Sequence, residues 1–387
     1  MKRDIVFVTH HLGGIGGVQR VVDQLATRFA EDGNRVTVIG CAVQSKEKYE
    51  RVQKNYHEIL LYQEDIFFEK PWLFLKEKFF SKKLEKKLTD ILSQSKETIV
   101  ILANPIVYLL MEKSLKEFSN TAFFIGQMHS SADFVLECKG IYKVYPYIIK
   151  NKYPKLDCMM FLSNSYSEVI SNHYNIPLKK FVAIPNPLPR YIEVSEESEE
   201  LRQEKSTVIS FVGRLDAVKQ IDHQIRAFAQ VADDFPDLIL NIYGSGNLRE
   251  FLQSLIDQLG MTKRIILKGK TNQVKEVYQR SLFTLLTSKS EAFPMSVVES
   301  MITGTPVLTY NCSQGVAELQ TATPEMLLDP CIEELVNKMR YFLSNTNILT
   351  DIGRRGRDYV IENYSEDIVI QKWYDLFKKL EDKKGIK

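Results

Sequence analysis

Short apolar runs alternate with longer amphipathic stretches along both halves of the chain. The runs have the length and the aliphatic content of buried strands, and the stretches between them repeat their apolar positions at helical spacing. In the first half we predict strands over Ile5–Thr9, Arg35–Ile39, Thr98–Leu102, Ala122–Ile125, Cys158–Leu162 and Val182–Ile184. In the second half we predict strands over Val208–Val212, Leu238–Tyr243, Ile265–Lys268, Phe283–Leu286, Val307–Thr309 and Met326–Leu328. Helices are expected between most of them, for example over Gln19–Glu31, Gln220–Asp233 and Leu248–Leu259.

This alternation predicts the α/β class, in which helices cover both faces of a parallel sheet. Because 387 residues exceed one ordinary core, we expect two Rossmann-like, doubly wound domains in tandem. Ligands of open parallel sheets bind beyond the carboxyl ends of the strands. The two domains are therefore expected to face a central cleft that holds the functional site.

The predicted domain boundary lies where prolines and acidic residues interrupt the apolar pattern. Ile184–Pro189 holds three prolines, which prevent a helix from continuing, and Glu193–Glu200 is acidic and polar, as solvated linkers are. The formal charge also changes, from +7 over residues 1–190 to −5 over the remainder. The predicted parts are an amino-terminal domain over 1–187, a linker over 188–203 and a carboxy-terminal domain over 204–364.

Several features of the sequence indicate a cytoplasmic protein. No apolar run reaches the roughly 18 residues that a membrane-spanning helix needs. Asp4 interrupts the apolar start of the chain, and no signal-peptide cleavage site follows it. The cysteines are five, scattered and never spaced as CxxC, which argues for a reducing compartment and against a zinc site or a disulfide framework.

A glycine-rich turn, Gly13–Arg20, follows the first predicted strand and opens a helix. Glycines here let the backbone approach a ligand, and the amino terminus of the helix offers N–H groups to an anion. The dinucleotide-binding fingerprint fails, because Gln19 stands where a third glycine belongs and no acidic residue ends the second strand. A plain strand-to-helix turn needs fewer glycines, so we favour close approach of a ligand.

The second domain places two cations after its first strand. Gly213 ends that strand, and Arg214 and Lys219 flank the start of the following helix. A diphosphate suits this pair, because a guanidinium grips two oxygens with directional bonds while an ammonium adds a point charge. The alternative is that both are ordinary solvated surface cations.

Two further segments follow predicted strands of the second domain. Gly244–Gly246 forms a second glycine-rich turn, and Ser290–Met301 contains two carboxylates, Glu291 in a loop and Glu299 inside a helix. Pro294 fits the first turn of that helix, where the amides of Met295, Ser296 and Val297 are expected to serve as donors. Carboxylates accept hydrogen bonds from vicinal hydroxyls, and Glu299 lies on a mostly apolar helix, where a carboxylate usually has a partner.

The ordered set of these motifs resembles the retaining nucleotide-sugar glycosyltransferases of the GT-B fold, family four, also called glycosyl transferases group one. The similarity rests on Gly213-Arg214 with Lys219, on Glu291 and Glu299 with seven residues between them, and on Gly304–Val307. It extends to Gly13–Arg20, to Ile184–Pro187 and to Asn363-Tyr364-Ser365 with Trp373. In that family the last helix crosses back to the first domain, which implies that residues 365–383 pack there.

The resemblance implies a role for each matching residue. Arg214 and Lys219 would bind the diphosphate and stabilise the leaving nucleoside diphosphate, Glu299 would hold the ribose, and Glu291 would contact the transferred sugar. The implied donor-binding residues are Gly16, Gly17, Gly213, Gly244, Ser245, Gly246, Lys270, Thr271, Phe293, Pro294, Met295, Ser296 and Glu299. His129 follows a strand of the first domain where the family has an active-site histidine, although Ser130 replaces the aspartate that many members have next to it.

The implied chemistry needs no cofactor and no metal ion. Charge that develops on the leaving diphosphate is stabilised by Arg214, Lys219 and a helix amino terminus. No Asp-x-Asp or histidine cluster resembles a cation site. The resemblance also implies retention at the anomeric carbon, with Glu291 positioning the sugar rather than attacking it.

Residues 67–88 combine aromatic and basic side chains. From Lys70 to Leu88 the segment carries seven lysines and two glutamates, with Trp72, Phe74 and Phe79 among them. This composition suits the headgroup layer of an anionic membrane, so we predict a peripheral site at the inner face of the cell membrane. The alternative is a helix that packs its aromatic side chains inward. No nucleic-acid motif accompanies the segment, and no nucleic-acid partner is expected.

The sequence therefore predicts an enzyme that transfers a hexose or N-acetylhexosamine from a nucleotide sugar, taken as UDP-linked, to a glycan or lipid-linked acceptor. Capsular or exopolysaccharide, teichoic acid or another cell-envelope glycan is the expected product. Glycosylation of a protein or lipid is the alternative enzyme reaction. A non-catalytic GT-B subunit of a transferase complex is the competing class, but it would not need to keep the cations and glutamates.

Overall fold

The structure is a computed structural model that describes residues 2–12, 17–43, 54–62, 74–95, 97–138, 143–192 and 207–383, with side chains of the second helix from residue 81 onward. The chain divides into two compact units, one of residues 1–187 with 369–387 and one of residues 188–368. The first unit ends at the predicted boundary, and the second begins with Leu188–Ile192. The rest of the predicted linker, 193–203, lies outside the described residues. No helix in the described part of the chain is long and apolar enough to span a membrane.

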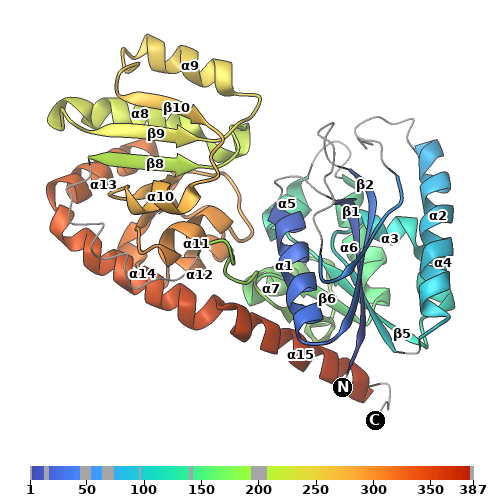
Figure 1. Cartoon of the computed structure of the whole chain (residues 1–387). Helices are drawn as coiled ribbons and strands as arrows, with labels where there is room; N and C mark the ends of the chain where they lie inside the picture. The colour runs from blue at the N-terminus through green and yellow to red at the C-terminus, as the bar shows by residue number, and fades with distance from the viewer. Residues whose placement is uncertain are drawn as a thin grey trace. The chain divides into compact units, whose positions relative to one another are not determined.

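The first unit is built on a seven-stranded parallel sheet in the order β3-β2-β1-β4-β5-β6-β7 (Figure 1). Its strands are β1 Asp4–Leu12, β2 Arg35–Val43, β3 His57–Leu60, β4 Thr98–Leu102, β5 Ala122–Gln127, β6 Cys158–Phe161 and β7 Phe181–Ala183. The central strands β4, β5 and β6 are buried along their whole length, which explains their largely apolar sequences.

Helices cover both faces of this sheet. They are α1 Gly17–Glu31, α2 Phe74–Leu92, α3 Ile106–Leu110, α4 Glu112–Glu117, α5 Ala132–Glu137, α6 Val144–Asn151, α7 Asn164–Tyr174 and, from the far end of the chain, α15 Glu366–Lys383. α1 and α15 share one core with the sheet, and α2, α3 and α4 lie on the opposite side of it (Figure 1). Trp373 and Phe377 of α15 are fully buried there against Phe29 of α1, with ring centroids 6.2 and 5.5 Å from it. The last helix thus belongs to the first unit from Val369 onward.

The second unit has a six-stranded parallel sheet in the order β10-β9-β8-β11-β12-β13. Its strands are β8 Val208–Val212, β9 Ile239–Tyr243, β10 Ile265–Gly269, β11 Thr284–Leu286, β12 Val307–Tyr310 and β13 Leu327–Leu328. Its helices are α8 Ile221–Val231, α9 Arg249–Gln258, α10 Val274–Gln279, α11 Met295–Ile302, α12 Gln314–Leu319, α13 Ile332–Ser344 and α14 Leu349–Tyr364. α8, α9 and α13 supply most of the helical side of its main core.

The α/β prediction is confirmed in both units. All twelve predicted strands are present, and the three helices named from the sequence lie within two residues of their predicted starts. One strand was not predicted: β3, an edge strand that pairs only with β2 among the described strands. Its sequence, His-Glu-Ile-Leu, begins with two polar residues, and three of its residues are half-buried, so it lacks the apolar run that marks the inner strands.

Candidate active site

The carboxyl ends of β8 and β9 in the second unit are brought together by two glycines. Gly244 has a φ of 141°, and a Cβ atom there would lie 1.7 Å from the carbonyl oxygen of Gly213. A Cβ at Gly246 would lie 2.2 Å from the carbonyl oxygen of Leu215. Only glycine fits at either position, because a side chain would push apart the two turns that follow these strands. The Ser245 carbonyl accepts a hydrogen bond from the Leu215 N–H at 3.0 Å, which holds the turn after β9 against the turn after β8.

Arg214 extends from this turn into solvent. Its guanidinium lies 3.0 Å from the Asp216 carboxylate, and its side chain is 75% exposed. Asp216 also accepts a hydrogen bond from the Val218 N–H at 3.1 Å, so its carboxylate is fixed at the start of the 3₁₀ turn Ala217–Lys219. An exposed ion pair of this kind is weak, and Arg214 can exchange Asp216 for another anion at little cost.

Lys219 and Glu291, to which the family resemblance gives roles at the diphosphate and the sugar, form an ion pair with each other. Lys219 Nζ donates to Glu291 Oε1 at 2.5 Å, and each side chain is only 14% exposed. Ser288 Oγ donates to the same carboxylate oxygen at 2.6 Å. The pair lies where the β8–α8 turn meets the loop between β11 and α11.

The backbone around this pair is fixed by buried polar groups. The Thr287 hydroxyl lies 3.0 and 2.9 Å from the carbonyl oxygens of Lys219 and Gln220, and Gln224 Nε2 donates to it at 2.9 Å. The Lys289 N–H donates to the Val218 carbonyl at 2.8 Å. These hydrogen bonds join the β8–α8 turn to the loop between β11 and α11. They therefore hold the Lys219 ammonium next to the Glu291 carboxylate.

Glu299 lies inside α11, and its side chain is buried with 6% of its surface exposed. The Tyr278 hydroxyl, from the end of α10, donates to Glu299 Oε2 at 2.9 Å. The Tyr191 hydroxyl, from the segment that follows the boundary prolines, donates to Glu299 Oε1. The sequence indicated that this carboxylate needs partners but did not identify the two tyrosines.

The start of α11 differs in detail from the expectation. Pro294 is the N-cap residue rather than part of the first turn, and its carbonyl accepts a hydrogen bond from the Val297 N–H at 3.0 Å. The expected use of the Val297 amide as an open donor is therefore wrong, because a tight first turn already satisfies it. Phe293 is buried, and its ring packs edge-on against Tyr364 with centroids 5.2 Å apart.

The other residues assigned to the donor lie around the same sheet edge. Met295 and Ser296 are half-buried in the first turn of α11. Lys270 is exposed just after β10, and Thr271 Oγ1 accepts a hydrogen bond from the Gln273 N–H at 3.0 Å. The Gly269 carbonyl accepts from the Gly244 N–H at 2.8 Å, which ties this segment to the glycine turn.

In the first unit, His129 lies just beyond β5. Its Nε2 atom is buried and has no hydrogen-bond partner among the described residues. Burial lowers the pKa of His129 to about 4, so the imidazole is neutral at pH 7 and offers a hydrogen bond rather than a positive charge. Gln127, at the end of β5, is also buried, and neither atom of its side-chain amide has a partner in the described part of the chain. Sequence reasoning missed this amide because it lies inside an apolar run.

Gly17 is the first residue of α1, and nothing described lies within 4 Å of a Cβ atom placed on it. Gly16, with the rest of the turn Gly13–Gly16, lies outside the described residues.

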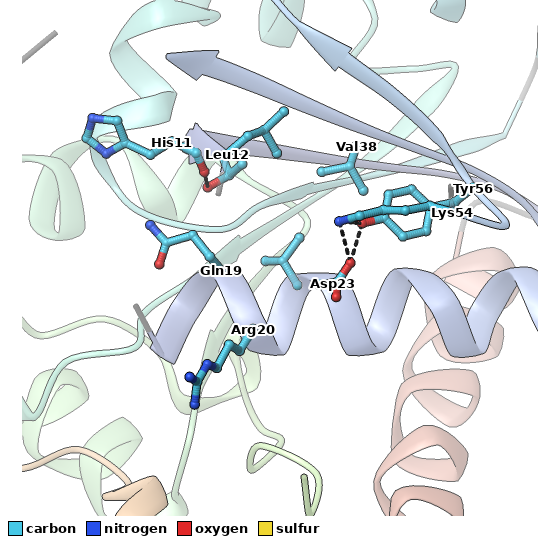
Figure 2. A pocket seen from close by; sticks show the side chains of 10 residues that line it. His11, Leu12, Gln19, Arg20, Asp23, Val38, Lys54 and Tyr56 are labelled. Carbon is cyan, nitrogen blue, oxygen red and sulfur yellow. Dashed lines mark hydrogen bonds and ion pairs between the residues drawn. The ribbon is translucent and has the colours of Figure 1, made fainter. Parts of the chain in front are cut away.

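A small cavity of about 120 Å³ lies beside α1 in the first unit (Figure 2). Asp23 of α1 accepts hydrogen bonds there from Lys54 Nζ at 2.6 Å and from the Tyr56 hydroxyl at 2.5 Å. Asp23, Lys54 and Tyr56 therefore satisfy one another there. Gln19 and Arg20, from the end of the predicted glycine-rich turn, also line the cavity, whereas none of the residues assigned to catalysis or to the donor does. Among the described residues, no group of three or more His, Cys, Asp or Glu side chains is placed to hold a metal ion.

The basic segment 67–88 is only partly described, since residues 67–73 and the side chains of 74–80 lie outside the description. In the remaining part of α2, Leu84, Leu88 and Leu92 are buried, while Lys82, Lys86 and Lys87 are exposed. The leucines of this part therefore pack inward and its lysines face outward. The aromatic side chains, on which the two interpretations differ, lie outside the described residues.

Known families match both units. The family described as Glycosyltransferase Family 4 matches residues 15–189, and the family described as Glycosyl transferases group 1 matches residues 194–359. The exopolysaccharide phosphotransferase of Streptomyces coelicolor is 27% identical over 233 residues, which cover 59% of this chain and 24% of the relative. The poly(ribitol-phosphate) alpha-N-acetylglucosaminyltransferase of Staphylococcus aureus is 21% identical over 293 residues, 75% of this chain and 57% of the relative. The chain thus spans less than two thirds of the length of either relative.

Among solved structures, Staphylococcus aureus TarM in complex with Fondaparinux, alpha-GlcNAc-glycerol and UDP is similar in fold. The TM-score is 0.80 at 14% identity, and the similarity covers 97% of this chain and 100% of that chain. The two parallel-sheet units, their order along the chain and both family matches agree. The chain is a glycosyltransferase of the GT-B fold, in which a Glycosyltransferase Family 4 domain precedes a Glycosyl transferases group 1 domain.

Proposed function

We propose that this glycosyltransferase moves a hexose or N-acetylhexosamine from a UDP-sugar to a cell-envelope polymer, with teichoic acid or an exopolysaccharide as the acceptor. The observation that carries the donor part is the cluster at the carboxyl edge of the second sheet, where Arg214 and the Lys219–Glu291 pair lie on segments that also lead to the buried Glu299. The acceptor part is supported by the similarity to the poly(ribitol-phosphate) transferase of Staphylococcus aureus, and the choice of a UDP donor by TarM, whose complex contains UDP.

The leaving diphosphate sets the chemical requirement of this reaction. Negative charge grows on it as the bond from the anomeric carbon to its oxygen breaks, and fixed positive groups lower the barrier. The exposed Arg214 can exchange Asp216 for phosphate oxygens, and Lys219 can share its ammonium between Glu291 and the diphosphate. These two cations supply the stabilisation that a metal ion would otherwise give, so we propose a metal-independent reaction.

Retention of the anomeric configuration belongs to the same proposal. The acceptor hydroxyl forms its bond to the anomeric carbon on the face that the diphosphate leaves, and its proton passes to a diphosphate oxygen. Glu291 is committed to Lys219 and Ser288. A carboxylate held in this way suits hydrogen bonds to the sugar better than attack on it. His129, whose imidazole is neutral and whose Nε2 atom is buried, is proposed to hydrogen-bond a substrate hydroxyl.

The experiment that tests the proposed function is a donor panel on the full chain. Purified protein is incubated with UDP-glucose, UDP-N-acetylglucosamine, GDP-mannose and ADP-glucose, and release of the nucleoside diphosphate is measured with and without poly(ribitol-phosphate). We expect release from a UDP-sugar, faster with the polymer and unchanged by EDTA, and a product with the donor's anomeric configuration. Absence of both turnover and UDP binding would favour the accessory-subunit alternative.

We further propose that the exposed lysines of α2 attach the protein to anionic membranes. Because the leucines of this part are buried, its binding is electrostatic and weakens as salt rises. In co-sedimentation at low salt, the wild type should bind phosphatidylglycerol liposomes, and a variant with Lys82→Glu, Lys86→Glu and Lys87→Glu should not. Phosphatidylcholine liposomes are the control. Equal binding of both proteins to the anionic liposomes would refute the role of these lysines.

A further inference from the structure

Glu299 is a buried carboxylate whose partners are hydroxyl groups rather than cations. In the described part of the chain, it pairs with no lysine or arginine and receives hydrogen bonds from Tyr278 and Tyr191. Burial of an ionised carboxylate costs free energy unless donors compensate it. An ionised carboxylate has about four acceptor positions, so the two phenol groups leave part of its capacity unused. This remaining capacity suits a ligand that brings two neighbouring hydroxyl groups.

The two tyrosines differ in how firmly they are held. Tyr278 is 1% exposed, and its backbone carbonyl accepts a hydrogen bond from the Thr305 hydroxyl at 2.8 Å. Its side chain donates to Glu299 Oε2 from within the packed layer of α10 and α11. Tyr278 therefore cannot leave the carboxylate without disturbing the core around it.

Tyr191 is 48% exposed and reaches Glu299 Oε1 from the short segment Leu188–Ile192. That segment is anchored at its base, because the Leu188 N–H donates to the Tyr364 carbonyl at 2.9 Å and Arg190 bonds both carboxylate oxygens of Glu366 at 2.7 and 2.6 Å. These hydrogen bonds keep the Tyr191 phenol close to Glu299, while its exposure allows the side chain to rotate toward solvent. The Tyr191 hydroxyl is thus the partner of Glu299 that a ligand can replace.

We propose that Tyr278 is a fixed positioning residue for Glu299 and that Tyr191 occupies Oε1 only until the ribose of the nucleotide replaces it. This inference rests on the proposed function, in which Glu299 binds the ribose hydroxyls. Tyr278 holds the carboxylate in the orientation that a vicinal diol requires. Tyr191 satisfies the buried charge in the nucleotide-free protein, and its hydrogen bond must break before both ribose hydroxyls are bound.

The two phenols therefore have opposite effects on nucleotide affinity. Without the Tyr278 hydroxyl, Glu299 is less well oriented, and affinity for UDP should fall about tenfold. Without the Tyr191 hydroxyl, the ribose no longer competes for Oε1, and affinity for UDP should rise about threefold. Neither change should alter the affinity for 2′,3′-dideoxyuridine diphosphate, which has no ribose hydroxyl to offer.

The test compares UDP with 2′,3′-dideoxyuridine diphosphate by isothermal titration on the full chain, its Y278F and Y191F variants and the matched control Y341F, a similarly exposed tyrosine on α13. We expect the preference for UDP to shrink in Y278F, to grow in Y191F and to stay at the wild-type value in Y341F. A merely structural role would change both affinities together. Because Y191F alters an exposed side chain, it keeps the test open if Y278F folds poorly.

The possible negative results distinguish failure of this inference from failure of the proposed function. An unchanged preference for UDP in both variants, or a loss in Y191F as large as that in Y278F, would overturn the inference while leaving the proposed function intact. If the wild type binds UDP and 2′,3′-dideoxyuridine diphosphate equally well, the ribose hydroxyls do not bind Glu299. The inference then fails, because it assumes that contact. A wild type that binds neither would overturn the proposed function as well.

Discussion

Replacing Lys219 or Arg214 with alanine is expected to lower kcat by about a hundredfold to a thousandfold, the usual effect of losing one group that stabilises charge in a transition state. The two variants differ in their effect on folding. The side chain of Arg214 is 75% exposed and forms an ion pair with Asp216, so R214A should unfold at the wild-type temperature. K219A removes the ammonium that compensates the mostly buried Glu291, so it should also lose some stability.

The measurement is initial-rate kinetics with a saturating UDP-sugar, together with thermal unfolding of each variant. Arg354→Ala is the matched control, because Arg354 is another exposed arginine of the second unit and pairs with Asp351 on α14. Its kcat should equal that of the wild type. A wild-type kcat in R214A would refute the assignment of the guanidinium to the diphosphate.

Replacing Trp373 with alanine is expected to destabilise the first unit by about 3–5 kcal/mol, the usual cost of deleting a buried indole. Trp373 is fully buried in the core that α15 shares with α1 and the sheet, and its ring packs on Phe29 and Phe377 with centroids 6.2 and 5.7 Å away. The cavity left by alanine cannot be filled from α15 alone, because its neighbouring apolar side chains are already packed.

Urea unfolding followed by circular dichroism tests this expectation, and Lys372→Ala is the control because Lys372 is the exposed neighbour on the same helix. The urea concentration at which the first unit unfolds should be lower in W373A than in the wild type, and it should be unchanged in K372A. Coincident unfolding curves for W373A and the wild type would show that α15 adds little to the core of the first unit.

Most of the fold could be predicted from the sequence because both sheets are parallel and buried. Strands such as β4, Thr98–Leu102, read as unbroken apolar runs, and amphipathic helices separate them. β3 escaped prediction because an edge strand has no need of an apolar run. The return of α15 to the first unit was implied by the family resemblance alone, since an amphipathic helix does not show which sheet it covers.

The charged residues of the candidate site were predictable because they follow strands that are themselves easy to recognise. Arg214 and Lys219 follow β8, and Glu291 follows β11. The pairing of Lys219 with Glu291 was not predictable, because it depends on how two loops meet in space. The same holds for Tyr191 and Tyr278, which lie far apart in the sequence and converge on Glu299 only in the folded unit.

The most direct test of the proposed donor site is a crystal structure of the full chain soaked with UDP. We expect the diphosphate oxygens within hydrogen-bond distance of the Arg214 guanidinium and the Lys219 ammonium, and the ribose hydroxyls on Glu299. A diphosphate bound away from both cations would contradict the donor site and the mechanism built on it.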